Sequence, residues 1–335
     1  MADIGIIGAG SWGTALSNLL SDNGHCITVW SCVPSEVEML KTFHEQKEKL
    51  PGVILPEDIS YTMDIAEAVT GKDMIVLAVP SPFTRSTSKA MAEFVAPGQL
   101  IVSVSKGIEE GTLMMLSDII EEEIPQSEVA VLSGPSHAEE VGRRMPTVVV
   151  AGAKTKEIAG HVQNIFMNEY FRVYTSCDRT GIQLGASVKN VIALAAGMAD
   201  GLGYGDNLKA ALIIRGTYEL QSLADAMGAN RDTLSGLTGT GDLIVTCGSM
   251  HSRNRRAGIL IGKGKSVKEA MDEVNQVVEG VFSAKGALEL AGKYNVELPI
   301  IEIVNKILFE NMPPKDAVRE LMMRNRKDEI TEMNF

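Results

Sequence analysis

A glycine-rich turn near the N-terminus constrains the fold of this chain more than any other stretch. Residues 3–7 read Asp-Ile-Gly-Ile-Ile, whose β-branched apolar side chains predict a buried strand. Gly8, Gly10 and Gly13 follow with the spacing G-x-G-x-x-G, and residues 14–20 continue in a helical pattern. In such a unit the first glycine allows a tight turn, the second admits a pyrophosphate, and the third packs the helix on the strand. The context therefore predicts a dinucleotide site rather than an ordinary glycine-rich turn.

The second predicted strand, residues 27–30, bears on the choice of cofactor. Sites that prefer NAD usually end this strand with Asp or Glu, which accepts a hydrogen bond from the ribose 2′-OH. Here Ser31 and Cys32 follow, and no acidic residue occurs before Glu36. No arginine follows to bind a 2′-phosphate either. We expect a site that favours NADPH and tolerates NADH.

Strand and helix patterns alternate through about residue 175. The further apolar runs that predict buried strands are residues 73–79, 100–104, 129–132 and 148–152. Helical patterns lie between them, including a charged segment at 35–50 that we expect to be a solvated helix face. This alternation is typical of an α/β domain with a Rossmann-type doubly wound parallel sheet. From about residue 180 the sequence is almost wholly helical, which predicts a dinucleotide-binding domain at 1–180 and an all-α substrate domain at 181–335.

Charge and composition exclude several classes of partner. The chain has 335 residues, with 31 Lys and Arg against 43 Asp and Glu, a net charge of −12. This balance argues against nucleic-acid and anionic-membrane binding. No run of about 18 apolar residues suggests a membrane span, and the sequence opens on a strand rather than a leader, so we expect a cytoplasmic protein. Four cysteines without C-x-x-C spacing and five scattered histidines suggest neither disulfides nor a metal site.

Two lysines and one aspartate are candidates for chemistry. Lys189 lies among small and apolar residues, so it either extends its amine to the surface or occupies a dry site that would lower its pKa. Lys106 follows an apolar strand at the edge where ligands bind, and an ordinary exposed loop lysine is the alternative. Asp242 lies among glycines and apolar residues, where a carboxylate needs a partner such as a lysine.

Two further segments could bind an anion. Residues 134–136, Gly-Pro-Ser, end another predicted strand and are either an anion-binding loop or a plain turn. Residues 252–256, Ser-Arg-Asn-Arg-Arg, form the one concentrated basic segment of an acidic chain, and arginine matches phosphate geometry. A solvated basic turn is the alternative. His137 lies close to the 134–136 turn, but we expect no catalytic role for it.

Seven ordered motifs resemble those of the NAD(P)-dependent glycerol-3-phosphate dehydrogenases, the bacterial type in particular. They are GAGSWGTA (8–15), SKG (105–107), SGPS (133–136), GASVKN (185–190), GTGDL (239–243), SRNRR (252–256) and VVEG (277–280). The resemblance extends from residue 3 to residue 329. It implies a Rossmann domain followed by a helical domain, and hydride transfer from NAD(P)H to dihydroxyacetone phosphate, which supplies sn-glycerol 3-phosphate for glycerophospholipid synthesis. It also makes a homodimer plausible, although the glycine- and alanine-rich segment 193–213 could pack within its own domain.

The resemblance also implies residue roles. The catalytic residues would be Lys189, as proton donor and acceptor, with Lys106 and Asp242. Substrate would be bound by Lys106, Gly134, Ser136, Lys189, Asn190, Asp242, Ser252, Arg253 and Asn254. The cofactor would be bound by Gly8, Gly10, Ser11, Trp12, Gly13, Cys32, Lys106, Ala138, Arg253, Val277 and Glu279. Trp12 differs from the Tyr or Phe usual in the family, and Cys32 replaces the basic residue or histidine of many members.

Two other functions are compatible with parts of the sequence. A two-domain 3-hydroxy-acid dehydrogenase would share the fold and a helical-domain lysine, but it would not need the basic segment 252–256. A non-catalytic NAD(P)H-sensing protein would need a partner-binding or DNA-binding element, and none is evident.

Overall fold

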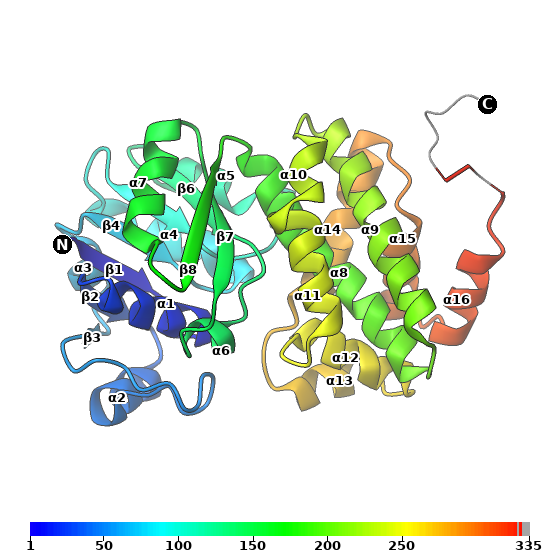
Figure 1. The fold of residues 1–335 in the computed structure, drawn as a ribbon, viewed down its shortest axis with the longest axis horizontal. Helices are drawn as coiled ribbons and strands as arrows, with labels where there is room; N and C mark the ends of the chain where they lie inside the picture. The colour runs from blue at the N-terminus through cyan, green and yellow to red at the C-terminus, as the bar shows by residue number, and fades with distance from the viewer. Residues whose placement is uncertain (327, 330–335) are drawn as a thin grey trace.

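A computed structural model describes residues 1–326 and 328–329 of the chain. Figure 1 shows two domains side by side, an N-terminal domain built on a sheet and a C-terminal domain made of helices. The helical domain expected at 181–335 therefore includes residues that lie outside the described ones, namely 327 and 330–335.

The N-terminal domain contains one eight-stranded sheet in the order β3-β2-β1-β4-β5-β6-β7-β8. The strands are β1 (Asp3–Ile7), β2 (Cys26–Trp30), β3 (Ser60–Thr62), β4 (Met74–Leu77), β5 (Leu100–Ser103), β6 (Glu128–Ser133), β7 (Thr147–Ala153) and β8 (Phe171–Ser176). The first six are parallel, and Ile4 of β1 lies opposite Ile27 on one side and Met74 on the other. The order reverses at β1 and β4, which is where a doubly wound sheet opens its ligand crevice.

Helices cover both faces of this sheet (Figure 1). They are α1 (Ser11–Asp22), α2 (Pro34–Phe43), α3 (Ile65–Val69), α4 (Thr84–Met91), α5 (Leu116–Glu123), α6 (Ala138–Val141) and α7 (Lys156–Phe166), with short 3-10 turns at Ser81–Phe83 and Ala92–Phe94. All four residues of β4 and all four of β5 are buried, as strands covered on both faces require. The predicted Rossmann-type fold class is confirmed.

The sequence predicted a parallel sheet, but the sheet is not parallel throughout. β7 pairs antiparallel with β6, and β8 pairs parallel with β7, so the last two strands run opposite to the first six. A parallel crossover usually needs a full helix laid across the sheet. The link between β6 and β7 contains only the four-residue α6, so the chain turns back directly. The eleven-residue α7 then provides a true crossover to β8.

The segment at 35–50 also differs from its prediction. α2 ends at Phe43, where His44 adopts a left-handed conformation with φ 50°, and the following residues form turns. Glu36 is not solvated: it is 5% exposed, it accepts a 2.6 Å hydrogen bond from Ser31 Oγ, and it pairs with Lys49. Residues 44–52 fold back over the start of α2, which a helical charge pattern does not reveal.

The C-terminal domain is arranged around α8 (Arg179–Gly201). The other helices are α9 (Asp206–Ala226), α10 (Arg231–Ser235), a π-helical turn (Leu237–Gly241), α11 (Asp242–Gly248), α12 (Arg253–Gly262), α13 (Val267–Val274), α14 (Glu279–Tyr294), α15 (Pro299–Phe309) and α16 (Pro314–Met322). By length and composition α8 could cross a membrane, but 94% of its most apolar 18-residue stretch is buried inside the protein. It is therefore packed as a core helix.

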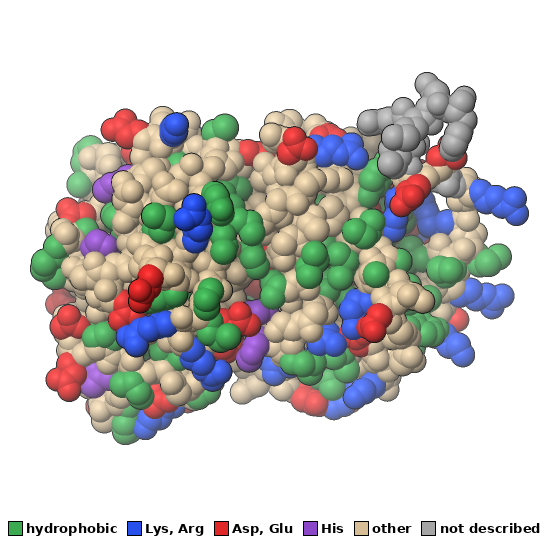
Figure 2. Space-filling view, in the orientation of Figure 1, with side chains coloured by type: hydrophobic (Ala, Val, Ile, Leu, Met, Phe, Trp, Pro, Cys, Tyr) green, Lys and Arg blue, Asp and Glu red, His purple; other side chains and the backbone are tan. Residues whose placement is uncertain are grey.

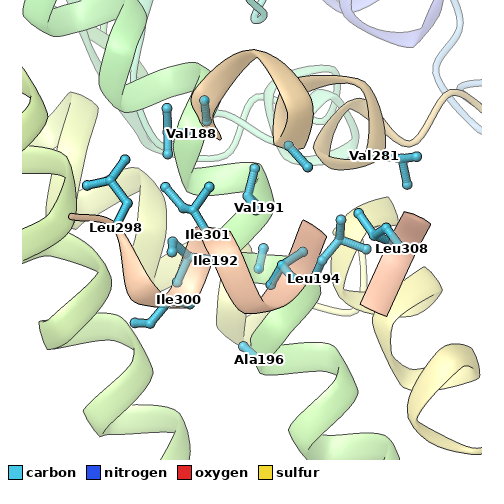
Figure 3. Close-up of a cluster of buried hydrophobic side chains, with 14 of the residues drawn as sticks. Val188, Val191, Ile192, Leu194, Ala196, Val281, Leu298, Ile300, Ile301 and Leu308 are labelled. Carbon is cyan, nitrogen blue, oxygen red and sulfur yellow. The ribbon is translucent and has the colours of Figure 1, made fainter. Parts of the chain in front are cut away.

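Small residues let the helices approach α8 closely. A Cβ atom on Gly197 of α8 would lie 2.2 Å from the carbonyl oxygen of Arg255, so α12 packs backbone to backbone against α8. Figure 3 shows Val188, Val191, Ile192 and other branched side chains of α8 meeting those of α14 and α15, including Ile301. This dense core fixes the position of every polar side chain that α8 directs toward the other domain.

Candidate active site at the domain boundary

The glycine turn after β1 has the geometry that a pyrophosphate requires. Gly8 has φ 119°, and a Cβ there would lie 2.8 Å from the carbonyl oxygen of Ala78. A Cβ on Gly13 would lie 1.9 Å from the oxygen of Gly8, so only glycine lets α1 pack this closely. Gly10 has no atom within 4 Å of such a Cβ, which leaves open space beside the backbone. Each glycine therefore meets the requirement predicted for its position.

The start of α1 leaves donors available beside this turn. Gly10 is the N-cap and provides no side-chain hydrogen bond, so the first N–H groups of α1 are free for an anion. Trp12, in the first turn of α1, has a buried Nε1 without a hydrogen-bond partner among the described residues. Cys32, beyond the end of β2, is exposed. These residues fit a dinucleotide laid across the carboxyl edge of the sheet.

Three charged side chains from distant segments meet where the two domains touch. Lys189 lies in the middle of α8, Asp242 begins α11, and Lys106 follows β5 of the other domain. Asp242 Oδ2 accepts from Lys106 Nζ at 2.9 Å, and Asp242 Oδ1 pairs with Lys189 Nζ. The side chains of Lys189 and Asp242 are 5% and 2% exposed, and that of Lys106 is 21% exposed. The carboxylate thus bridges two ammonium groups across the domain boundary.

Burial and charge set the protonation of this cluster. Burial lowers the pKa of Lys189 to about 7, although Asp242 raises it, and the neighbouring Lys106 lowers it further. Burial alone would raise the pKa of Asp242, but the two lysines hold it below its usual value. Lys189 can therefore exchange a proton near neutral pH while Asp242 stays ionised.

Further polar contacts fix the orientation of Lys189 and of its neighbour Asn190. Thr246, one turn after Asp242 on α11, accepts a 2.9 Å hydrogen bond from Lys189 Nζ and donates one to the Asp242 carbonyl at 2.5 Å. Asn190 Oδ1 accepts from Asn254 Nδ2 at 2.9 Å, and Asn254 Oδ1 accepts from the Gly280 N–H at 2.8 Å. Sequence reasoning missed Thr246, although its position four residues after Asp242 on a helix was a usable signal.

The loop after β6 approaches the same cluster. Lys106 Nζ donates to the carbonyl of Gly134 at 3.2 Å, and Ser136 Oγ donates to the same oxygen at 3.0 Å. Gly134 has φ 148°, and a Cβ there would lie 3.0 Å from the Cα of Val149. Ala138 begins α6 directly after this turn. Lys106 is therefore not an ordinary exposed loop lysine, because its amine is hydrogen-bonded at the domain boundary.

Arg253 and Arg255, two of the three arginines of residues 252–256, differ in their surroundings. Arg255 binds Asp200 through Nε at 2.9 Å and Nη2 at 2.8 Å, so its charge is already satisfied. Arg253 has no ion pair or hydrogen bond with any residue the structure describes, and burial lowers its pKa while Glu279 and Glu139 raise it. It lies in the first turn of α12, whose N-cap Ser252 accepts from the Arg255 N–H at 3.2 Å. A half-buried guanidinium without a partner among the described residues, at the N-terminus of a helix, offers favourable charge for an anion.

Glu279 joins the domains on another side of the site. Ser81, which follows β4, donates to Glu279 Oε2 at 2.7 Å. Burial raises the pKa of Glu279, and the hydrogen bond from Ser81 and the positive charge of Arg253 partly offset that rise. Val277 precedes it in the link between α13 and α14. Sequence reasoning missed Ser81, since only the fold brings the end of β4 to the start of α14.

Comparisons with known proteins give this chain a family. The family models described as the N-terminus and C-terminus of NAD-dependent glycerol-3-phosphate dehydrogenase match residues 3–159 and 178–319. A protein named glycerol-3-phosphate dehydrogenase (NAD(P)+) from Agathobacter rectalis is 63% identical over all 335 residues and covers both chains completely. One of the same name from Fusobacterium nucleatum is 58% identical, covering 98% of this chain and 99% of that one.

A solved structure extends the comparison to three dimensions. The glycerol-3-phosphate dehydrogenase of Coxiella burnetii superposes with a TM-score of 0.93 at 35% identity, covering 96% of this chain and 99% of that one. Both sequence and fold match along nearly the full length. The chain therefore belongs to the family of NAD(P)-dependent glycerol-3-phosphate dehydrogenases.

Proposed function

We propose that this site reduces dihydroxyacetone phosphate to sn-glycerol 3-phosphate with NAD(P)H, and catalyses the reverse oxidation. The observation that supports it best is the bridged cluster of Lys189, Asp242 and Lys106 at the boundary between the two domains. Such a product would serve glycerophospholipid synthesis, as the resemblance implies.

In the proposed mechanism Lys189 is the general acid. A nicotinamide cofactor, when bound, would supply the hydride that C2 of the ketone accepts. As negative charge grows on the carbonyl oxygen, protonated Lys189 donates its proton, and Lys106 with Asn190 stabilises the developing charge. Asp242 holds both ammonium groups in place. In the reverse direction neutral Lys189 takes the proton from the alcohol, which a pKa of about 7 favours.

The substrate phosphate is assigned to the start of α12. Arg253 would bind it through charge-assisted hydrogen bonds, and the N–H groups near Ser252 and Asn254 would add the helix dipole. Gly134 and Ser136 would contact the substrate from the other domain. This assignment accounts for a half-buried Arg253 without an ion pair among the described residues, whereas Arg255 is already paired with Asp200.

The cofactor is assigned to the carboxyl edge of the sheet. Residues in its contact surface would be Gly8, Gly10, Ser11, Trp12, Gly13, Cys32, Ala138, Val277 and Glu279, together with Lys106 and Arg253. We favour NADPH over NADH. The carboxylate of Glu36, which does lie beside Ser31 at the end of β2, is already engaged by Lys49.

We also propose a cytoplasmic homodimer whose domains divide at 180/181. Three of the four cysteines are exposed free thiols, which suits a reducing compartment. α8 packs within its own domain, which leaves the outer face of α9, where Ile214 is 57% exposed, for a second subunit. The proposed division falls just inside α8, two residues after its N-cap. Light scattering coupled to gel filtration tests the dimer, and a monomer at micromolar concentration would contradict it.

The first experiment is reductase activity, followed as loss of NADPH and then NADH absorbance on adding dihydroxyacetone phosphate. We expect oxidation of both, with the larger kcat/KM for NADPH. Lys189→Ala should lower kcat by about 10²–10⁴-fold, because a general acid is lost, with cofactor affinity nearly unchanged. The matched control is Lys268→Ala, an exposed lysine on α13. Turnover of Lys189→Ala within about tenfold of wild type would contradict the assigned role.

A further inference from the structure

Two histidines face each other across the domain boundary beside the charged cluster. His137 precedes α6 in the sheet domain, and His251 precedes α12 in the helical domain. Their ring centroids lie 5.8 Å apart with the planes tilted by 53°. Figure 2 shows histidine side chains at this boundary. Neither ring is used by the mechanism described above.

The Nε2 atom of His137 is buried and has no hydrogen-bond partner among the described residues. Buried polar atoms are almost always paired, so a partner is missing from the protein itself. The charged groups that act on His137 are Lys189, Glu139, Lys106 and Asp242. Burial and the two lysines lower its pKa, which keeps the imidazole neutral and able to donate or accept a hydrogen bond. His137 thus adjoins the reacting end of the site.

The loop that carries His137 is held firmly. The Lys106 ammonium and the Ser136 hydroxyl both donate to the Gly134 carbonyl, three residues before the ring. His137 is the N-cap of α6 but makes no capping hydrogen bond through its side chain. Its ring is therefore free to bind something else, while its backbone is fixed relative to Lys106.

We propose that His137 Nε2 hydrogen-bonds the C1 hydroxyl of dihydroxyacetone phosphate, and so makes the enzyme specific for a hydroxylated ketone. This inference rests on the proposed function. The substrate has three polar groups: the phosphate is assigned to Arg253, and the carbonyl oxygen to the two lysines. The hydroxyl on C1 remains, adjacent to the carbonyl carbon, and His137 supplies a buried nitrogen beside the cluster that lacks a partner among the described residues.

The test compares two substrates that differ only in this hydroxyl. Hydroxyacetone phosphate is the same phosphorylated ketone with hydrogen in place of the C1 hydroxyl. The measured quantity is the ratio of kcat/KM for dihydroxyacetone phosphate to that for hydroxyacetone phosphate. His137→Phe keeps a ring of similar shape and removes both nitrogens. We expect the ratio to fall by about tenfold, mostly through slower reaction of dihydroxyacetone phosphate, because a buried hydrogen bond is lost.

Further variants separate this role from packing. His137→Gln, which restores a side-chain donor, should recover part of the ratio. His161→Phe, an exposed histidine on α7, is the matched control and should leave both rates unchanged. If His137→Phe slows both substrates equally, or neither, the proposal is overturned. If His251→Phe collapses the ratio and His137→Phe does not, the assignment to His137 is overturned as well. Failure of the proposed function is seen separately, as no turnover of dihydroxyacetone phosphate by the wild type.

Discussion

Replacing Asp242 by asparagine tests the electrostatic logic of the site, because it removes one charge while preserving shape. Asp242 is buried and bridges Lys106 and Lys189. Its attraction is what keeps the pKa of Lys189 as high as about 7 in a site where burial and Lys106 both lower it. Without the carboxylate, Lys189 should lose its proton at a much lower pH, and the acid that reduction needs would be scarce.

The size of this effect follows from Coulomb's law. Opposite charges about 4 Å apart at an effective dielectric constant of about 20 attract by about 4 kcal/mol, which corresponds to about three pKa units. The pKa of Lys189 in Asp242→Asn would then be about 4. At about pH 7 the protonated fraction falls from about one half to about one in a thousand. A stronger acid donates its proton more readily, so we expect the reduction rate to fall by somewhat less, about 10- to 500-fold.

The assay is the pH dependence of kcat for reduction, from initial rates with saturating NADPH. For the wild type, lowering the pH from about 7 to about 5 only doubles the protonated fraction of Lys189. For Asp242→Asn the same change raises that fraction about 100-fold, so the variant should regain activity steeply in acid. A variant that is equally slow at both pH values would refute the reasoning, since a simple loss of structure gives no such recovery.

Other substitutions probe separate parts of the molecule. Arg253→Ala should raise KM for dihydroxyacetone phosphate by about 10²-fold with little change in NADPH affinity, because a charge-assisted contact is lost; steady-state kinetics check this. Gly13→Ala should destabilise the fold by about 1–3 kcal/mol in urea unfolding, since its Cβ would meet the Gly8 oxygen at 1.9 Å, whereas Gly10→Ala should spare stability and weaken NADPH binding. Burial raises the pKa of Glu219 to about 8. The contribution of the protonated Glu219 side chain to the free energy of unfolding is therefore fully present below about pH 4.5 and is lost as pH rises through about 8. The wild type should therefore lose up to a few kcal/mol of unfolding free energy between about pH 4.5 and pH 8, and Glu219→Gln should lack this loss when urea unfolding is measured at both pH values.

Local features of the site could be predicted because short-range physics determines them. The close packing required of Gly13 is set within one strand, turn and helix, because a Cβ there would meet the Gly8 oxygen at 1.9 Å. The small and apolar neighbours of Lys189 left two possibilities, an amine at the surface or a dry site, and the structure places that side chain at 5% exposure. Asp242 required a charged partner for the same reason, and it has two.

Features that depend on long-range pairing could not be predicted. The reversed direction of β7 depends on how the link at 134–146 turns back, not on the apolar pattern of the strand, which is the same in either direction. Glu36 looked solvated because its burial comes from Lys49 folding over it, outside the helix that contains it. His137 was noted only for its position beside the 134–136 turn, because its closeness to His251 and to the lysines of other segments depends on the fold.

The charge balance of the cluster explains why two lysines share one aspartate. When Lys189 is protonated the three side chains carry a surplus of one positive charge in a buried site, which is unfavourable until an anion forms there. The oxygen of the ketone becomes that anion as hydride arrives, so the surplus is neutralised most fully in the transition state. After the proton moves, Lys189 is neutral, the alcohol is neutral, and Lys106 with Asp242 forms a balanced pair. A single lysine paired with Asp242 would be balanced before the reaction and would have no such preference for the transition state.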